Sequence, residues 1–256
     1  MANTTTRRVA INGATGTLGS RIFSALNAAG HEVTAVQRKD SSKSAPDGLK
    51  SVKVDYANKE ELVSIFKGQD IVISYLTSVM TDTNGPTTWT SVNNGAFFDM
   101  TLPYGVLGPN IMAKKTVFHN GGDNKIAVSL LADIGTAIVK LLATDNIFNS
   151  AANQPVYICS AAITERQLTE LVSEVTGIDF GSPEQVSVKE LIEKSDERLK
   201  QGDKSAIINY YLQMMYGEGY KRGDFMNFNW NARLGLRIMS EQDLKNTIQE
   251  ILGKFV

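Results

Sequence analysis

The stretch that decides the fold is VAINGATGTLGSRI, residues 9–22. Its glycines at positions 13, 16 and 19 follow a short apolar strand-like run and precede residues with apolar side chains at helical spacing. A strand, a glycine-rich turn and a helix in this order are typical of a dinucleotide-binding loop. Gly13 permits the tight turn, Gly16 lets the backbone approach a pyrophosphate without a Cβ in the way, and Gly19 lets helix and strand pack closely.

The start of the helix after this turn is the expected phosphate-binding position. A helix N-terminus presents unpaired N–H groups and the positive end of the helix dipole. Thr15, Thr17 and Leu18 lie there, and we predict that they bind the cofactor together with Gly13, Gly16 and Gly19. The alternative is a tight strand-to-helix turn that binds no ligand.

The end of the second predicted strand indicates which cofactor is bound. NAD-specific sites place an acidic residue there for the ribose hydroxyls, but this chain has Gln37, followed by Arg38 and Lys39. Arginine grips a phosphate bidentately, so we expect the 2′-phosphate of NADP(H), with Lys43 as a further cation. Asp40 comes late for a ribose contact. The alternative is a solvated basic loop.

The pattern around this turn predicts a parallel sheet. Strand-like and helix-like segments alternate four times, which is typical of a sheet with helices on its faces. The helix at 58–69 has Asn58 as a plausible N-cap and ends at Gly68. Asp55, at the end of the third strand, is either an adenine contact or a turn residue. The expected strands are 7–13, 31–38, 49–58 and 70–76, and the first helix follows Gly16.

The rest of the chain has a mixed pattern. Residues 116–130, TVFHNGGDNKIAVSL, read as a β-hairpin around a Gly-Gly-Asp-Asn turn. The helix at 164–177 opens with a capping box, Thr164 and Gln167. We expect a cofactor domain over residues 1–100, to which a strand at 155–160 returns, and a smaller, mainly helical α/β lobe over residues 101–256.

Composition limits the class of protein. The 256 residues are 42% hydrophobic and 21% charged, with a formal net charge of −1, as in globular proteins without a basic excess for nucleic acid. No apolar run reaches the length of a membrane span, and no signal-peptide core precedes the first strand. Cys159 is the single cysteine and fits a reducing compartment, so cytoplasm is expected. Two distant histidines and one cysteine predict no metal site.

Several segments together resemble the atypical short-chain reductases of the NmrA-like and isoflavone-reductase-like group. They are INGATGTLGSRI, VQRKD, VKVDYANKEELVSIFKGQDIVIS, TWTSVNNGAFFDM and SLLADIGTAIVKLL. The resemblance implies a doubly wound Rossmann domain, a small substrate lobe and NADPH as cofactor. It also implies either reduction of a small, often aromatic molecule or redox sensing through a protein partner without catalysis.

One departure from the family concerns the catalytic machinery. The family has a helix, a strand and a lysine-bearing segment between the fourth strand and TWT. Here the connection from Tyr75 to Thr87 has no room for them, because one parallel crossover alone takes roughly a dozen residues. The chain has no lysine between Lys67 and Lys114. No catalytic residue is therefore assigned, and enzyme and non-catalytic sensor both stay open.

Two further groups have a chemical and a structural interpretation. Phe97 and Phe98 are candidate substrate-binding residues, with Met100 beside them, and we expect two of these three to lie in the core instead. For His119 we prefer a structural role over acid–base chemistry, and for Cys159 that of a small buried hydrophobe.

Overall fold

The computed structural model describes residues 5–44, 50–74, 87–219 and 223–253. The chain divides into two compact units, residues 1–92 with 131–156 and residues 93–130 with 157–256. The division therefore falls after Val92, near the expected boundary at residue 100. Residues 131–156 then rejoin the first unit, so the second unit takes in more of the chain and is not the smaller one.

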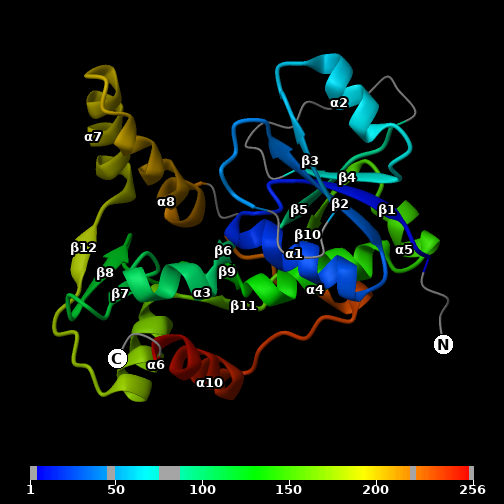
Figure 1. Cartoon of the computed structure of the whole chain (residues 1–256). Helices are drawn as coiled ribbons and strands as arrows, with labels where there is room; N and C mark the ends of the chain where they lie inside the picture. The colour runs from blue at the N-terminus through cyan, green and yellow to red at the C-terminus, as the bar shows by residue number, and fades with distance from the viewer. Residues whose placement is uncertain (1–4, 45–49, 75–86, 220–222, 254–256) are drawn as a thin grey trace. The chain divides into compact units, whose positions relative to one another are not determined.

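The first unit is built on a parallel sheet of four strands (Figure 1). Its order is β3-β2-β1-β4, so the chain moves to the opposite side of β1 when it forms β4. Ligands of open α/β sheets bind at such a switch point, outside the carboxyl ends of the strands. The predicted doubly wound Rossmann-type sheet is confirmed. The strands are β1 (Arg8–Asn12), β2 (Glu32–Arg38), β3 (Lys50–Val54) and β4 (Ile71–Ser74).

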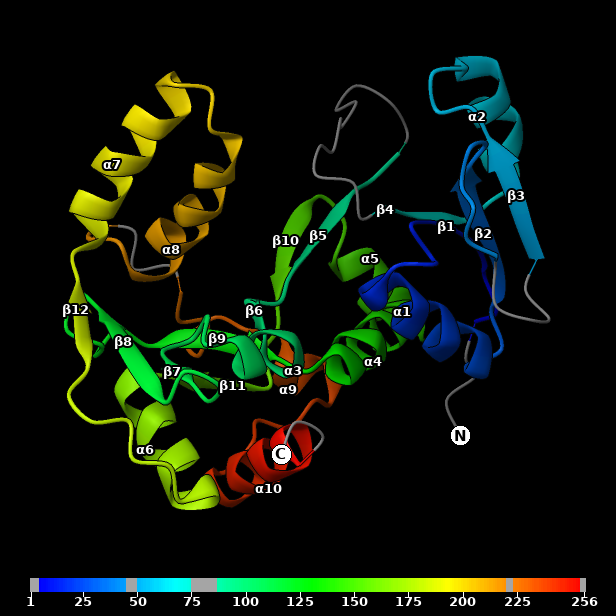
Figure 2. The same ribbon diagram turned by 60° about the vertical axis from the view of Figure 1, so that its left-hand side comes forward.

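Helices cover both faces of this sheet, as Figures 1 and 2 show. On one face, α2 (Lys59–Phe66) packs against a small cluster of Ala10, Val36 and Val54. On the other, α1 (Thr17–Ala28) lies beside α4 (Leu131–Leu142). A Cβ at Gly135 of α4 would lie 3.3 Å from the Cβ of Ala25, so glycine there permits the close approach of the two helices.

The predicted ends of α2 are confirmed. The Asn58 side chain accepts hydrogen bonds from the N–H groups of Glu60 and Glu61, at 3.0 and 3.1 Å. After Lys67 the chain turns away through Gly68, whose φ is 82°, a conformation that glycine adopts readily.

The strand expected to return near 155–160 is β10 (Gln154–Tyr157), preceded by α5 (Asp145–Ser150). It pairs with β5 (Thr90–Asn93) in a separate two-stranded sheet. The Thr90 hydroxyl donates to the Ala151 carbonyl at 2.7 Å, and the Asn153 N–H donates to the Trp89 carbonyl at 2.7 Å. These bonds tie the turn before β10 to the start of β5.

The second unit contains two small three-stranded sheets and most of the later helices. One sheet has the order β11-β9-β6, from Ala161–Ile163, Ile126–Ser129 and Ala96–Phe97. The other has the order β12-β8-β7, from Glu184–Val186, Lys115–His119 and Pro109–Asn110. The helices are α3 (Phe98–Thr101), α6 (Glu165–Thr176), α7 (Val188–Lys200), α8 (Asn209–Tyr216), α9 (Asn231–Leu234) and α10 (Glu241–Leu252), with 3₁₀ turns at Leu102–Tyr104 and Lys204–Ile208.

The predicted hairpin over residues 116–130 is wrong. Its two strands, β8 and β9, belong to different sheets. Gly121 and Gly122 both have positive φ, and the Arg166 guanidinium donates to the Gly121 carbonyl at 2.9 Å and to Asp123 at 3.0 Å. The connection is thus held by α6, and the strands find partners that are distant in the sequence.

The capped helix of this unit is as expected. The Thr164 hydroxyl and the Gln167 side chain form both bonds of the capping box of α6, and the helix ends at Gly177 in the left-handed conformation. Leu168, Leu171 and Val172 of this helix lie in the main core of the unit.

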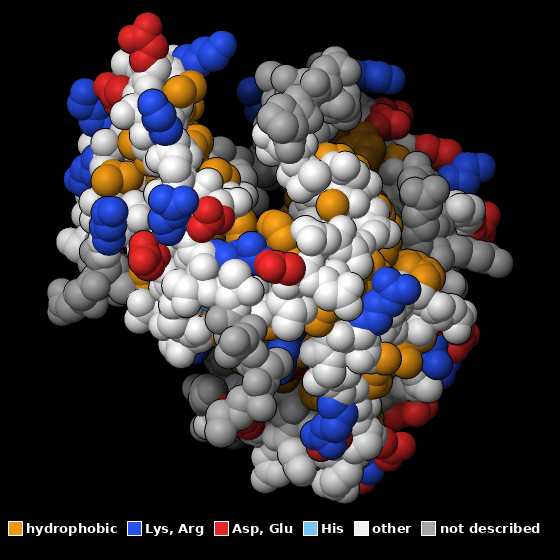
Figure 3. All heavy atoms as spheres, turned by 90° about the vertical axis from the view of Figure 1, so that its right-hand side faces the viewer, with side chains coloured by type: hydrophobic (Ala, Val, Ile, Leu, Met, Phe, Trp, Pro, Cys, Tyr) orange, Lys and Arg blue, Asp and Glu red, His pale blue; other side chains and the backbone are white. Residues whose placement is uncertain are grey.

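Two general features concern the surface. Lys and Arg side chains are interspersed with Asp and Glu on the face that Figure 3 shows, in keeping with the net charge of −1. In the described ranges, no helix has both the length and the apolar character that crossing a membrane requires.

Candidate cofactor site

The glycine turn after β1 has the geometry that a phosphate-binding loop needs. Gly13 has a φ of 81°, and the Gly16 N–H donates to the Gly13 carbonyl at 3.0 Å. A Cβ at Gly19 would lie 2.1 Å from the Gly13 carbonyl oxygen, so any side chain there would push helix and turn apart. At Gly16 the same oxygen would be 3.3 Å away, a tighter contact than most Cβ atoms make but far less severe than that at Gly19.

The first turn of α1 offers donors to a ligand. Gly16 is the N-cap residue, and as a glycine it has no side chain that could cap the helix. The first backbone bond of the helix runs from the Ser20 N–H to the Gly16 carbonyl, at 2.9 Å. The N–H groups of Thr17, Leu18 and Gly19 therefore precede the helical hydrogen-bond pattern. This arrangement of donors and small residues fits the pyrophosphate of a dinucleotide.

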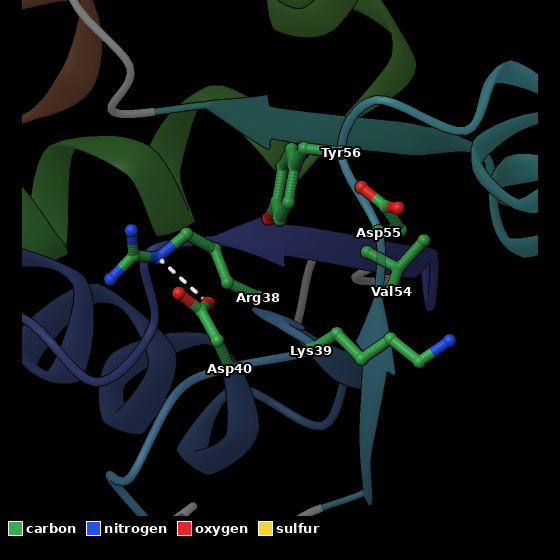
Figure 4. Close-up of a pocket in the computed structure, with 6 residues that line it drawn as sticks. All are labelled: Arg38, Lys39, Asp40, Val54, Asp55 and Tyr56. Atoms are coloured by element: carbon green, nitrogen blue, oxygen red, sulfur yellow. Dashed lines mark ion pairs between the residues drawn. The ribbon is translucent and has the colours of Figure 1, made fainter.

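A hollow of about 440 Å³ lies at the carboxyl ends of β2 and β3 (Figure 4). Its lining combines two cations and two carboxylates with one apolar and one aromatic side chain. The predicted residues Arg38, Lys39 and Asp55 are brought together here. The full lining is Arg38, Lys39, Asp40, Val54, Asp55 and Tyr56.

Arg38 and Asp40, which both line this hollow, form an ion pair. The distance from Arg38 Nε to Asp40 Oδ1 is 3.6 Å, and the two side chains are 72% and 76% exposed. Figure 4 shows the Lys39 side chain extending away from this pair. Of the two adjacent cations, Arg38 forms this ion pair, and the side chains of Arg38 and Lys39 are both exposed to solvent.

Gln37 organises the loop that follows β2. Its side chain is buried, and its Nε2 donates to the Lys43 carbonyl at 3.1 Å. The Lys53 ammonium of β3 donates to the Ser41 carbonyl at 2.9 Å. Gln37 thus occupies the place of the NAD-type acidic residue without facing the ligand side. The Lys43 side chain is exposed and does not line the hollow.

Tyr56 is a residue of the hollow for which the sequence analysis predicts no role. Its hydroxyl lies 3.1 Å from Asn12 Oδ1 and 3.2 Å from the Val36 carbonyl, so its single O–H is shared between acceptors at the ends of β1 and β2. Burial raises the pKa of this phenol, and the Arg38 charge opposes part of that rise. The helpful sequence signal was an aromatic residue directly after Asp55 at a strand end.

Asp55 serves the turn after β3. Its Oδ1 accepts a hydrogen bond from the Ala57 N–H at 2.9 Å, and its carbonyl accepts one from the Asn58 N–H at 3.0 Å. The side chain also lines the hollow. The turn role is therefore present, and the adenine contact stays a prediction.

The predicted substrate residues lie in the second unit and differ in exposure. Phe98 is completely buried in the core of that unit, so the core interpretation applies to it and it presents no surface to a substrate. Phe97 is half-buried and stays a candidate, and Met100 is 38% exposed.

His119 belongs to a buried polar cluster in the same unit. Its Nδ1 lies 2.6 Å from Glu165 Oε1, and its backbone N–H donates to Glu165 Oε2 at 2.6 Å. The imidazole stacks on the ring of Tyr216 at 5.0 Å between centroids. Burial, with the charge of Glu165, raises the pKa of Tyr216 well above its usual value. The cluster joins β8, α6 and α8, which agrees with the structural role expected for His119.

Comparison with known proteins identifies the first part of the chain. Residues 13–102 match the protein family described as NAD(P)H-binding. The match begins at Gly13, the first residue of the glycine turn. The family match supports a nicotinamide cofactor, and the turn geometry fits the pyrophosphate of a dinucleotide.

Relatives and solved structures extend the similarity beyond residue 102. The oxidoreductase poxI of Penicillium oxalicum is 21% identical, over 82% of each chain. An isoflavone reductase structure has a TM-score of 0.71 at 16% identity, covering 95% of this chain and 99% of its own. An NADPH-dependent quinone oxidoreductase of Escherichia coli, solved with NADPH, has a TM-score of 0.65 at 14% identity, covering 94% and 99%. The resemblance to isoflavone-reductase-like proteins is thereby confirmed in fold.

The short connection from Tyr75 to Thr87, which departs from the family pattern, falls almost entirely outside the part of the chain that the structure describes. Residues 75–86, which make up nearly all of it, lie outside the described residues. The missing lysine remains a statement about the sequence alone.

Proposed function

We propose that the protein binds NADPH and uses it to reduce a small aromatic or unsaturated molecule. One observation carries the proposal: the glycine turn after β1 and the Arg38 hollow after β2 lie at the carboxyl edge of one parallel sheet. A dinucleotide spans this edge in folds of this kind, with its pyrophosphate at the turn and its adenosine beside the second strand.

The pyrophosphate and the adenosine end of the cofactor then have partners among the described residues. The N–H groups of Thr17, Leu18 and Gly19 receive the pyrophosphate. Arg38 receives the 2′-phosphate, with Lys39 and Lys43 adding positive charge nearby. The ring of Tyr56, held by its hydroxyl, supplies a flat apolar surface beside the adenine. These assignments favour NADPH over NADH, because a guanidinium matches a phosphate better than a ribose hydroxyl.

When bound, the cofactor supplies the hydride chemistry. The chain contributes binding and orientation through the residues named above. The names of the similar proteins, an isoflavone reductase and a quinone oxidoreductase, support aromatic and unsaturated carbonyl compounds as the first substrates to test.

A second function is favoured by one specific feature. The chain has no lysine between Lys67 and Lys114, where the resembled family carries its catalytic one. A non-catalytic regulator that senses NADP(H) and acts through a protein partner needs the adenosine and phosphate contacts but not that lysine. Binding without turnover distinguishes this alternative.

Thermal unfolding of the full chain with NADPH, with NADH and with neither tests the proposal. A ligand at a hundred times its Kd adds about 2.7 kcal/mol to the free energy of unfolding, which is a rise of roughly 5 to 10 °C in Tm for a chain of this size. We expect this rise with NADPH and a smaller one with NADH. An unchanged Tm with both would overturn the proposal.

A second assay separates reductase from regulator. NADPH absorbance is followed with a panel of quinones, enones and aryl ethers, and the Arg38→Ala variant serves as control for cofactor-dependent turnover. Consumption by the wild type supports the reductase. A Tm shift without consumption across the panel supports the regulator.

A further inference from the structure

The hollow that we assign to the adenosine end contains balanced charge. Arg38 and Lys39 supply two positive charges, and Asp40 and Asp55 supply two negative ones. A site for a 2′-phosphate gains from positive charge alone, so a carboxylate at 3.6 Å from Arg38 needs an explanation. Asp55 is engaged in the turn after β3, whereas the Asp40 carboxylate lies beside Nε of Arg38 (Figure 4).

We propose that Asp40 is a specificity-determining residue. It reduces the preference of this site for 2′-phosphorylated over non-phosphorylated nucleotides. It pairs with Arg38 in the free protein and repels the phosphate that takes its place. The inference rests on the proposed NADPH site and deepens it.

The pair is positioned to exchange partners easily. Both side chains are more than two-thirds exposed, and solvent-exposed ion pairs contribute little to stability. A phosphate carries more charge than a carboxylate and accepts both N–H groups of the guanidinium. Arg38 therefore turns from Asp40 to a 2′-phosphate at small cost, while the Asp40 carboxylate stays beside the new anion.

The loop keeps Asp40 near that position. The Gln37 amide donates to the Lys43 carbonyl, and the Lys53 ammonium donates to the Ser41 carbonyl. These two bonds hold the backbone after Asp40 to β2 and β3. The Ser41 N–H also donates to the Arg38 carbonyl at 3.0 Å. The backbone of Asp40 lies within this hydrogen-bonded turn, directly before Ser41.

A nucleotide without the 2′-phosphate meets a different partner. Its ribose 2′-hydroxyl is a donor, and the Asp40 carboxylate is an acceptor. Asp40 comes late in the sequence for a ribose contact, but the structure brings it beside Arg38 in the lining of the hollow. The same residue thus opposes one ligand and accepts the other. This accounts for an acidic residue in a hollow that Arg38 otherwise suits to phosphate.

The test uses two small probes that represent the adenosine ends of the two cofactors, adenosine 2′,5′-bisphosphate and 5′-AMP. Their Kd values are measured by titration calorimetry on the full-length wild type, on Asp40→Asn and on Arg38→Ala. The matched control is Asp123→Asn, which removes the same charge from another exposed Arg–Asp pair, Arg166–Asp123, in the second unit. No turnover is involved in the readout.

We expect Asp40→Asn to bind the bisphosphate about two- to fivefold more tightly, as for one surface charge pair, and 5′-AMP no more tightly than the wild type does. The gain should shrink at high salt, because the repulsion is screened. Asp123→Asn should match the wild type. Arg38→Ala should lose the preference for the bisphosphate.

Equal bisphosphate affinity in wild type and Asp40→Asn would overturn the inference while leaving the NADPH site intact. Failure of the wild type to bind either probe would overturn both proposals.

Discussion

The phenolic oxygen of Tyr56 lies 3.1 Å from Oδ1 of Asn12, the residue directly before the glycine turn. The same hydroxyl lies 3.2 Å from the Val36 carbonyl near the end of β2. One side chain from the end of β3 therefore links the ends of β1 and β2, between which the cofactor is proposed to lie. Asn12 is 6% exposed, so water does not readily replace this partner.

Tyr56→Phe should destabilise the protein, because it leaves the Asn12 amide oxygen and the Val36 carbonyl without this donor. Removal of one partner of a buried hydrogen bond costs about 1–3 kcal/mol. Urea denaturation followed by circular dichroism measures the change. Tyr211→Phe is the matched control, because that side chain is 56% exposed and its substitution should leave the midpoint in place. Equal midpoints for the two variants would show that the Tyr56 hydroxyl is not a structural link.

Substitutions at two glycines of the turn should have different effects, one on folding and the other on cofactor binding. Gly19→Ala places a Cβ 2.1 Å from the Gly13 carbonyl oxygen, and such overpacking costs typically about 1–3 kcal/mol. Gly16→Ala places it at 3.3 Å, so the fold should tolerate it while the new methyl group obstructs the pyrophosphate.

Thermal unfolding of both variants with and without NADPH checks this pair. We expect a lowered Tm for Gly19→Ala without ligand, and a near-normal Tm for Gly16→Ala with a reduced response to NADPH. A Gly16→Ala variant that responds like the wild type would argue against pyrophosphate binding at this turn.

Glu165→Gln should be among the most destabilising single changes in the second unit. The carboxylate is fully buried and accepts hydrogen bonds from both the backbone and the imidazole of His119. Removing one partner of such a buried pair costs about 3–5 kcal/mol. Asp123→Asn, which breaks the exposed pair with Arg166, is the control, with an expected cost of at most about 1 kcal/mol. Similar costs for both changes in chemical denaturation would contradict the role given to the cluster.

Cys159 should be unreactive in the folded protein. Burial, with the charge of Asp224, raises the pKa of its thiol to about 11, so at pH 8 about one thiol in a thousand is ionised, whereas the thiolate is the reactive form. Iodoacetamide labelling followed by mass spectrometry should show slow modification in buffer and fast modification in urea. Rapid labelling of the folded chain would contradict the burial.

The same pKa predicts a pH dependence of stability. From about pH 9 to about pH 11 the unfolded chain loses the thiol proton and the folded chain keeps it, so the unfolded state binds fewer protons and stability falls as pH rises. Cys159→Ala should lose less stability across this range than the wild type does. Parallel curves for the two proteins would place the cause in other groups.

Local patterns explain what the sequence predicted well. The glycine spacing at 13, 16 and 19, the N-cap Asn58 and the capping box of Thr164 and Gln167 each depend on residues within one or two turns of chain. Their hydrogen bonds close over a few residues, so the residue types alone identify them. The parallel direction of the first four strands follows from the same local alternation of strand and helix, whereas their order β3-β2-β1-β4 is seen only in the structure.

The strands at 115–119 and 126–129 pair in a way that local sequence patterns do not predict. Two apolar runs around a glycine-rich turn predict a hairpin, yet β8 pairs with β12 and β7, while β9 pairs with β11 and β6. Strand pairing is decided by which partners bury the most surface in the whole unit, and those partners lie far away in the chain. The buried His119–Glu165 pair arises in the same way, from residues 46 positions apart.

For the cofactor site, the sequence by itself determined the phosphate turn and the cations after the second strand, because their chemistry lies in consecutive residues. The tertiary structure alone decided that Gln37 faces the loop backbone, that Tyr56 joins three strand ends and that Asp40 faces Arg38. These roles depend on the direction of each side chain once the strands are side by side. That direction follows from the register of β1, β2 and β3, which no single stretch of residues contains.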